Sequence, residues 1–231
     1  MRYLTVKNIL FLSFFLMILA CPVAGRADFV TPSPNLPPLD GQYVSPDQWH
    51  ALYAMGIVLT DVVHKGFTAS YPPPEPGMTD IHTFGSQVEG EVSFDGGVTF
   101  QPFSTSGPTT VQITAELGSE NPSYYDTEML QLDLSGGTLP PGVLIRESPT
   151  LASTGETTIT DIGGGMYHID SFFDVFTELS LDDGNTWYPD LDGPAHMVLQ
   201  QNTPEPSSLI LLGFGVLGLL AIIRRGRKQA A

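Results

Sequence analysis

Cysteine is nearly absent from this chain of 231 residues, and the single cysteine, Cys21, lies close to the start. A lone cysteine can form no disulfide within the chain. If residues 1–27 are removed on export, the mature protein contains no cysteine at all. The stability of the folded part must therefore come from the burial of apolar side chains and from strand pairing.

Basic residues are also scarce, because only Lys65 and Arg146 occur between Asp28 and Pro206. The same segment holds all 25 acidic residues, and the whole chain has a formal net charge of −16. A surface of this sign repels nucleic acid and anionic lipid headgroups. We therefore expect no nucleic-acid partner, and we interpret most of the acidic side chains as a solvated surface.

Catalytic motifs are missing as well. The chain has no G-x-S-x-G, no H-E-x-x-H and no P-loop. Paired carboxylates remain an open route to glycoside hydrolysis, since many acidic residues are available, but no pair stands out. We therefore predict a protein that is not an enzyme and binds no metal through its histidines. The five histidines are far apart in the sequence: His50, His64, His82, His168 and His196.

The densest group of acidic residues lies near the end of the folded part. It consists of Asp182, Asp183, Asp190 and Asp192. Oxygen ligands of this kind suit calcium, but the spacing matches neither an EF-hand nor a calcium-binding repeat. We therefore predict no cofactor and keep calcium at this group as the alternative.

The first 27 residues have the pattern of a secretory signal peptide. Arg2 and Lys7 precede an apolar run over residues 9–20, and small residues around Ala24 lead to a cleavage site after Ala27. The sequence that ends at Cys21 is similar to a lipobox. The match is imperfect because the bulky Leu19 occupies a position where a small residue is usual. Lipidation of Cys21 is therefore the alternative to its removal with the signal peptide.

The last 29 residues, 203–231, have three parts in a fixed order. Pro204, Glu205 and Pro206 come first, and an uncharged apolar run follows over residues 207–223. A basic cluster ends the chain: Arg224, Arg225, Arg227 and Lys228. The run is at the short limit for a helix crossing a hydrocarbon core roughly 30 Å thick. The basic cluster predicts that this single transmembrane helix keeps its C-terminus in the cytoplasm.

This three-part tail resembles the PEP-CTERM sorting signal of Gram-negative bacteria. The resemblance implies recognition by an exosortase, removal of the tail, and release to the cell surface or the exopolysaccharide matrix. Before that step, the folded part would be periplasmic and held at the inner membrane. A plain single-pass anchor is the alternative. The same tripeptide recurs at Pro74, Glu75 and Pro76, but no apolar run follows it there.

Between these ends we predict a proline-rich linker over residues 28–41 and one folded domain over residues 42–202. The linker sequence TPSPNLPPLDG is typical of an extended segment. Ser45, Pro46 and Gln48 have the order of a helix start, with a capping residue and a proline at the first helical position. We therefore expect one short helix that ends near Gly56.

The rest of the domain has short β-branched and aromatic segments separated by turn residues. This pattern predicts a mostly β fold, and we expect an antiparallel sandwich. The predicted strands cover residues 57–68, 81–94, 98–102, 109–117, 128–134, 142–147, 157–162, 166–181, 186–189 and 195–201. The proline-rich segment 71–77 is predicted to be a loop.

One pattern occurs twice, at residues 91–102 (EVSFDGGVTFQP) and 178–189 (ELSLDDGNTWYP). Each copy places a Gly-containing turn between apolar segments, which predicts a hairpin. We interpret the copies as two related β-units that form the halves of one domain.

Both copies resemble the Asp-box hairpin of sialidases and several unrelated β-folds. The matching residues are Ser93, Asp95, Gly97, Thr99 and Phe100, and then Ser180, Asp182, Gly184, Thr186 and Trp187. We expect the aspartate to bond the turn amides and the aromatic ring to pack under the hairpin. A sialidase activity is not implied, because those enzymes need an arginine cluster and the domain has Arg146 alone.

The sequence therefore predicts an exported surface or matrix protein with a structural, adhesive or carbohydrate-contacting role. Its expected partners are signal peptidase and an exosortase during export, the membrane before processing, and extracellular polysaccharide afterwards. The alternative is a secreted hydrolase that acts on extracellular polysaccharide through a carboxylate pair.

Overall fold

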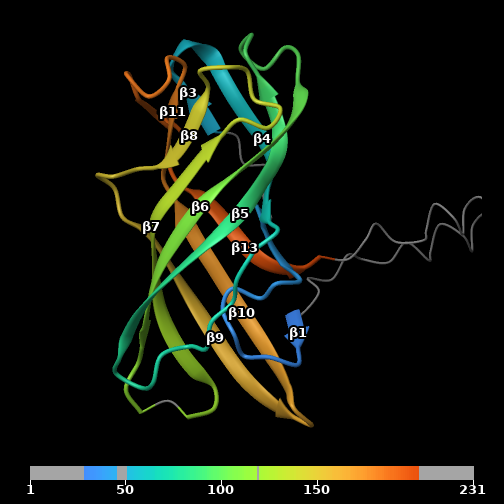
Figure 1. Cartoon of the computed structure of the whole chain (residues 1–231), viewed down its shortest axis with the longest axis vertical. Coiled ribbons are helices and arrows are strands. Elements are labelled where there is room, and N and C mark those ends of the chain that lie inside the picture. Colours follow the sequence, from blue (N-terminus) through green and yellow to red (C-terminus); the bar gives the residue numbers. More distant parts are fainter. Residues whose placement is uncertain (1–28, 46–50, 119, 203–231) are drawn as a thin grey trace, which may run out of the picture.

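The computed structural model describes residues 29–45, 51–118 and 120–202 of the chain (Figure 1). All the paired strands in these ranges are antiparallel and belong to one sheet of 13 strands. The predicted mostly β, antiparallel fold is confirmed. None of the helical segments in the described ranges has the length and apolar character needed to cross a membrane.

The strands vary from two to fifteen residues in length. They are β1 (Phe29–Thr31), β2 (Gly41–Val44), β3 (Ala51–Tyr53), β4 (Ile57–Lys65), β5 (Thr79–Ser93), β6 (Gln101–Ala115), β7 (Ser123–Ser135), β8 (Leu144–Glu147), β9 (Ser153–Gly163), β10 (Met166–Val175), β11 (Thr177–Ser180), β12 (Tyr188–Pro189) and β13 (Ala195–Gln201).

Eight of these strands close into a ring. The order is β2-β4-β5-β6-β7-β9-β10-β13, and β13 pairs with β2 again. The fold is therefore an eight-stranded barrel, and the predicted sandwich is wrong. Alternating apolar and polar residues are expected for either architecture, because both bury one face of each strand. The barrel closes because β9 pairs with both β7 and β10.

The remaining strands extend the ring. β3 pairs with β4, while β8, β11 and β12 continue from β7 at the upper end of the barrel in Figure 1. The first copy of the repeated pattern joins two long ring strands, and the second joins β11 to the two-residue β12 outside the ring. The copies therefore do not form two halves of the domain.

The predicted helix ending near Gly56 is wrong in the part that the structure describes. Residues Ala51–Tyr53 form β3, and a single 3₁₀ turn covers Ala54–Gly56. Ala51 and Tyr53 are buried and Leu52 lies between them, which is the two-residue period of a strand. Strand pairing with β4 thus outweighs the local helix-start signal.

The proline-rich segment between β1 and β2 is packed against the barrel. Leu36 is buried, and its backbone exchanges two hydrogen bonds with Tyr71, at 2.8 and 2.9 Å. β1 pairs with β10 immediately before this segment. The predicted loop that begins at Tyr71 is thereby held against the start of the chain.

A single strand, β6, replaces the two strands predicted over residues 98–102 and 109–117. Gly107 and Pro108 lie inside it and pair with Ser86 and Gly85. A side chain at Gly107 would collide with the carbonyl oxygen of Asp133 on β7. Glycine at this position therefore allows the close approach of β6 and β7, where the sequence alone indicates a break.

Candidate functional site

The first of the two repeated turns is held by the side chains of Ser93 and Asp95. The Ser93 hydroxyl donates to Asp95 Oδ1 at 2.8 Å and accepts from the Gly97 amide at 2.9 Å. Asp95 Oδ1 accepts from the Thr99 amide at 2.9 Å, and Asp95 Oδ2 accepts from the Thr99 hydroxyl at 2.6 Å. These bonds lower the pKa of Asp95 to about 2, with the Thr99 hydroxyl the largest cause.

The second turn repeats these contacts. The Ser180 hydroxyl donates to Asp182 Oδ1 at 2.9 Å and accepts from the Gly184 amide at 2.9 Å. The Thr186 amide donates to Asp182 Oδ1 at 2.8 Å and is the first cause of the lowered pKa of Asp182. In both turns the aspartate is committed to the backbone of its own hairpin. Their relation to the Asp-box stays a prediction.

The aromatic residues of the two turns have different surroundings. Trp187 lies against Arg146, with the guanidinium carbon 3.9 Å from the ring centroid. Arg146 also donates to Glu178 Oε2 through Nε at 3.0 Å and through Nη2 at 2.7 Å. Phe100 in the first turn is 39% exposed. The second turn is therefore tied to β8 and β11 by a charged cluster.

Glu147, next to Arg146 on β8, is a buried acid that no sequence motif indicates. The Ser153 hydroxyl donates to its Oε1 at 3.0 Å. The pKa of Glu147 is raised to about 7, mainly by burial and to a smaller extent by the nearby carboxylates of Glu128 and Glu178. Alternation along β8, where Ile145 is also buried, was the available signal.

The acidic group proposed as a calcium site is occupied by protein contacts. Asp190 Oδ1 accepts from the amides of Leu52 and Asp192, both at 3.0 Å. Burial raises the pKa of Asp190 to about 6. Asp182 is bound within its own turn. In the described ranges, no three His, Cys, Asp or Glu side chains are grouped so that they could hold a metal ion.

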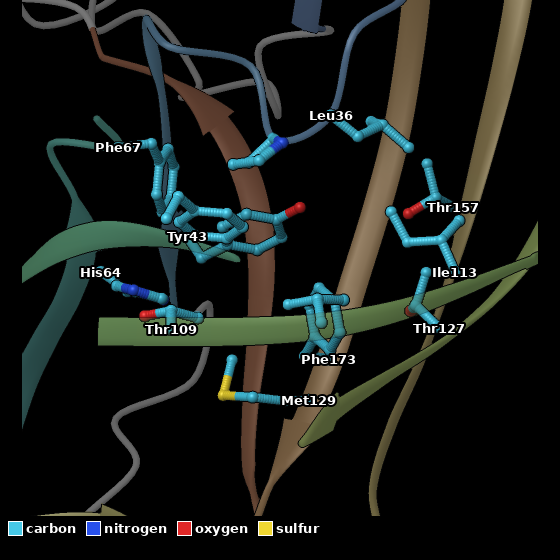
Figure 2. A pocket seen from close by; sticks show the side chains of 13 residues that line it. Leu36, Tyr43, His64, Phe67, Thr109, Ile113, Thr127, Met129, Thr157 and Phe173 are labelled. Atoms are coloured by element: carbon cyan, nitrogen blue, oxygen red, sulfur yellow. The ribbon is translucent and has the colours of Figure 1, made fainter. Parts of the chain in front are cut away.

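The interior of the barrel is filled by side chains. Figure 2 shows Tyr43, Phe67 and Phe173 pointing into the space between the strands, with Met129 below them and His64 to one side. Cavities of about 30 and 50 Å³ lie among the described side chains of this interior, and both are lined by His64 and Met129. Cavities of this size can hold a water molecule or two. Burial lowers the pKa of His64 to about 4, so this histidine is neutral.

The other described histidines lie apart. His82 packs beside Tyr71, with 4.9 Å between ring centroids, and His196 Nδ1 is 2.7 Å from Asp174 Oδ1 on the outside of the barrel. The structure brings none of them to His64. His50 is outside the described residues.

A surface groove of about 240 Å³ lies at the opposite end of the barrel from the two turns. It is lined by Pro73–Pro76, by Ala115 and Glu116, and by Ser123–Tyr125. The internal Pro-Glu-Pro copy is thus part of a groove wall. The sequence predicts this segment only as a loop. The groove could not be found from sequence, because its three segments are distant in the chain.

The comparison with protein families supports the interpretation of the tail. The profile of the PEP-CTERM protein-sorting motif matches residues 202–228. The match includes Pro204, Glu205, Pro206 and the four basic residues. No curated protein and no solved structure matches the chain. The chain is therefore an exported protein that an exosortase sorts through this motif.

Several predictions concern residues outside the described ranges. They are the signal peptide over residues 1–27 with Cys21, the helix start at Pro46 and Gln48, and the transmembrane helix over residues 207–223. Their structures are not described, and the transmembrane helix and lipidation stay predictions.

Proposed function

We propose that the barrel is a non-enzymatic component of the cell surface or extracellular matrix, with a structural or carbohydrate-contacting role. Signal peptidase removes residues 1–27, and the apolar tail then holds the chain at the inner membrane with the barrel in the periplasm. An exosortase removes the tail and releases the barrel to the outside.

The observation that carries this proposal is the position of the sorting motif relative to the barrel. β13 ends at Gln201, and the amide of Asn202 donates to the carbonyl oxygen of Asp40 at 3.1 Å. The motif match begins at residue 202, where this last contact of the barrel occurs. Cleavage near Pro206 would therefore remove the tail and leave every strand of the barrel in place.

Intact mass and terminal peptides of the protein from native cells and from the medium test the route. We expect a chain that starts at Asp28, ends near Pro206 and occurs outside the cell. Replacement of Pro204, Glu205 and Pro206 by alanine should leave the full tail on a cell-associated chain. A full-length tail on the unchanged protein in the membrane would instead indicate a plain anchor.

A secreted hydrolase is the second candidate, and the raised pKa of Glu147 favours it. A carboxylic acid that is protonated near neutral pH can act as a general acid. Glu178, its neighbour, forms an ion pair with Arg146 at 2.7 Å. Hydrolysis of polysaccharides that disappears in Glu147→Gln while the variant keeps its melting temperature would support this candidate over the first.

A further inference from the structure

The groove between the Pro73–Pro76 loop and the start of β7 has fixed walls. The Met78 amide donates to the carbonyl oxygen of Glu75 at 2.9 Å, which closes a turn that contains Pro76 and Gly77. Backbone hydrogen bonds of 2.9–3.0 Å join Gly77 and Met78 to Ala115. The prolines restrict the loop further, so a ligand would find the groove already formed.

The side chains of the groove present hydrogen-bond acceptors and apolar faces. Tyr124 is 43% exposed, and Glu75 and Glu116 are exposed too. Within the described part of the chain, no hydrogen bond or ion pair engages either carboxylate. A carboxylate only accepts hydrogen bonds and forms short, strong ones with hydroxyl donors. Tyrosine and proline offer apolar faces beside these acceptors.

We propose that this groove binds an uncharged segment of a polysaccharide. A hexose ring combines hydroxyl donors, which match Glu75 and Glu116, with an apolar C–H face, which matches the ring of Tyr124. This inference rests on the proposed function, because it assigns the carbohydrate contact to one place on the barrel.

Charge selects against acidic polysaccharides. The two basic residues of the folded part are already engaged, because Lys65 Nζ lies 2.6 Å from Glu89 and Arg146 lies 2.7 Å from Glu178. No described cation is therefore available to a uronic acid, and the two groove carboxylates would repel it. The ligand must therefore offer hydroxyl groups without negative charge.

Calorimetry on the processed protein tests the site with hexasaccharides of glucose, mannose and galactose in α and β linkage, and with oligogalacturonate as the acidic probe. We expect at least one neutral hexasaccharide to bind and oligogalacturonate not to bind. Tyr124→Ala and Glu75→Gln should each weaken binding at least tenfold. Absence of binding across the neutral panel would overturn the proposal, as would equal binding of oligogalacturonate.

Phe100→Ala is the matched control, since Phe100 is 39% exposed at the other end of β5 and β6. It should leave binding unchanged, and binding that Phe100→Ala weakens as much as Tyr124→Ala would overturn the site. Circular dichroism checks that each variant is folded. The cellular location of the protein distinguishes the two proposals. A barrel that is found outside the cell but binds no neutral sugar would refute only the binding site in the groove. A chain retained in the membrane would refute the proposed function.

Discussion

Trp187 and Arg146 form a stacked pair, with 3.9 Å between the guanidinium carbon and the ring centroid, although they are far apart in the sequence. The stack holds the second repeated turn against β8. We expect Trp187→Ala to lower the free energy of unfolding by about 1 kcal/mol, through loss of the cation–π contact and of ring packing. Urea unfolding measures this change. Trp187→Phe, which keeps an aromatic ring, should lose less stability. An unchanged urea midpoint in Trp187→Ala would contradict a stabilising role of the stack.

Removal of only one partner of the ion pair between Arg146 and Glu178 should lower the free energy of unfolding strongly. The Glu178 side chain is 11% exposed, so removing its partner leaves a nearly buried charge. We expect Arg146→Leu to destabilise the barrel by about 3 kcal/mol. The double variant Arg146→Leu with Glu178→Leu should recover much of this loss in the same unfolding assay. A double variant no more stable than Arg146→Leu would contradict the argument.

Asp182 and Asp183 provide a matched test of the repeated turns. Asp182 accepts hydrogen bonds within the turn, whereas the Asp183 carboxylate has no hydrogen bond to any residue in the described ranges. Asp182→Asn weakens these charge-assisted bonds and should lower the melting temperature by roughly 2–4 °C. Asp183→Asn should change it little, since asparagine tolerates the positive φ of 57° there. Equal melting temperatures for the two variants would remove the structural role of Asp182.

Glu147 and Asp190 should each contribute less to stability as the pH rises towards and through neutrality. Burial raises the pKa of Glu147 to about 7 and that of Asp190 to about 6, above their values in the unfolded chain. The protonated acids are therefore favoured by folding, and their contribution is complete below about pH 4 and is lost as each folded-state group ionises. For Glu147 the loss between pH 5 and 8 should be on the order of 2 kcal/mol.

Denaturant unfolding over this pH range, on the unchanged protein and on Glu147→Gln, measures the effect. Glu147→Gln should flatten the dependence, and Glu156→Gln, on an exposed acid of β9, should not. His64 acts in the opposite sense below about pH 6.5, because burial lowers its pKa to about 4, but it is present in all three proteins and cancels in the comparison. A Glu147→Gln variant with the same pH dependence as the unchanged protein would contradict the burial of Glu147.

Truncation should show where the barrel ends. A chain of residues 28–202 retains β13, which pairs with both β10 and β2, and should unfold cooperatively. A chain of residues 28–194 lacks β13, so the ring opens between β10 and β2 and the interior is exposed to water. We expect circular dichroism and urea titration to show no cooperative transition for the shorter chain. Cooperative unfolding of both would show that closure by β13 is not required.

Local signals in the sequence determined much of the strand content. The predicted strand at residues 195–201 agrees with β13 (Ala195–Gln201), and the predicted strand that begins at residue 57 agrees with β4 (Ile57–Lys65). Both have apolar, β-branched sequences between turn residues, so short-range chemistry is enough. The order of Pro204, Glu205 and Pro206, the apolar run and the basic cluster likewise identified the sorting motif, because an exosortase recognises a linear segment.

Only the tertiary structure decided how the strands close and which side chains meet. A barrel and a sandwich have the same alternating pattern, and closure depends on the pairing of β9 with both β7 and β10. The local sequence at Ser45 indicates a helix start, whereas residues Ala51–Tyr53 form β3 because they pair with β4, a contact that local sequence does not show. Trp187 meets Arg146, and Glu75 and Tyr124 line one groove, because the fold brings together segments that are distant in the chain.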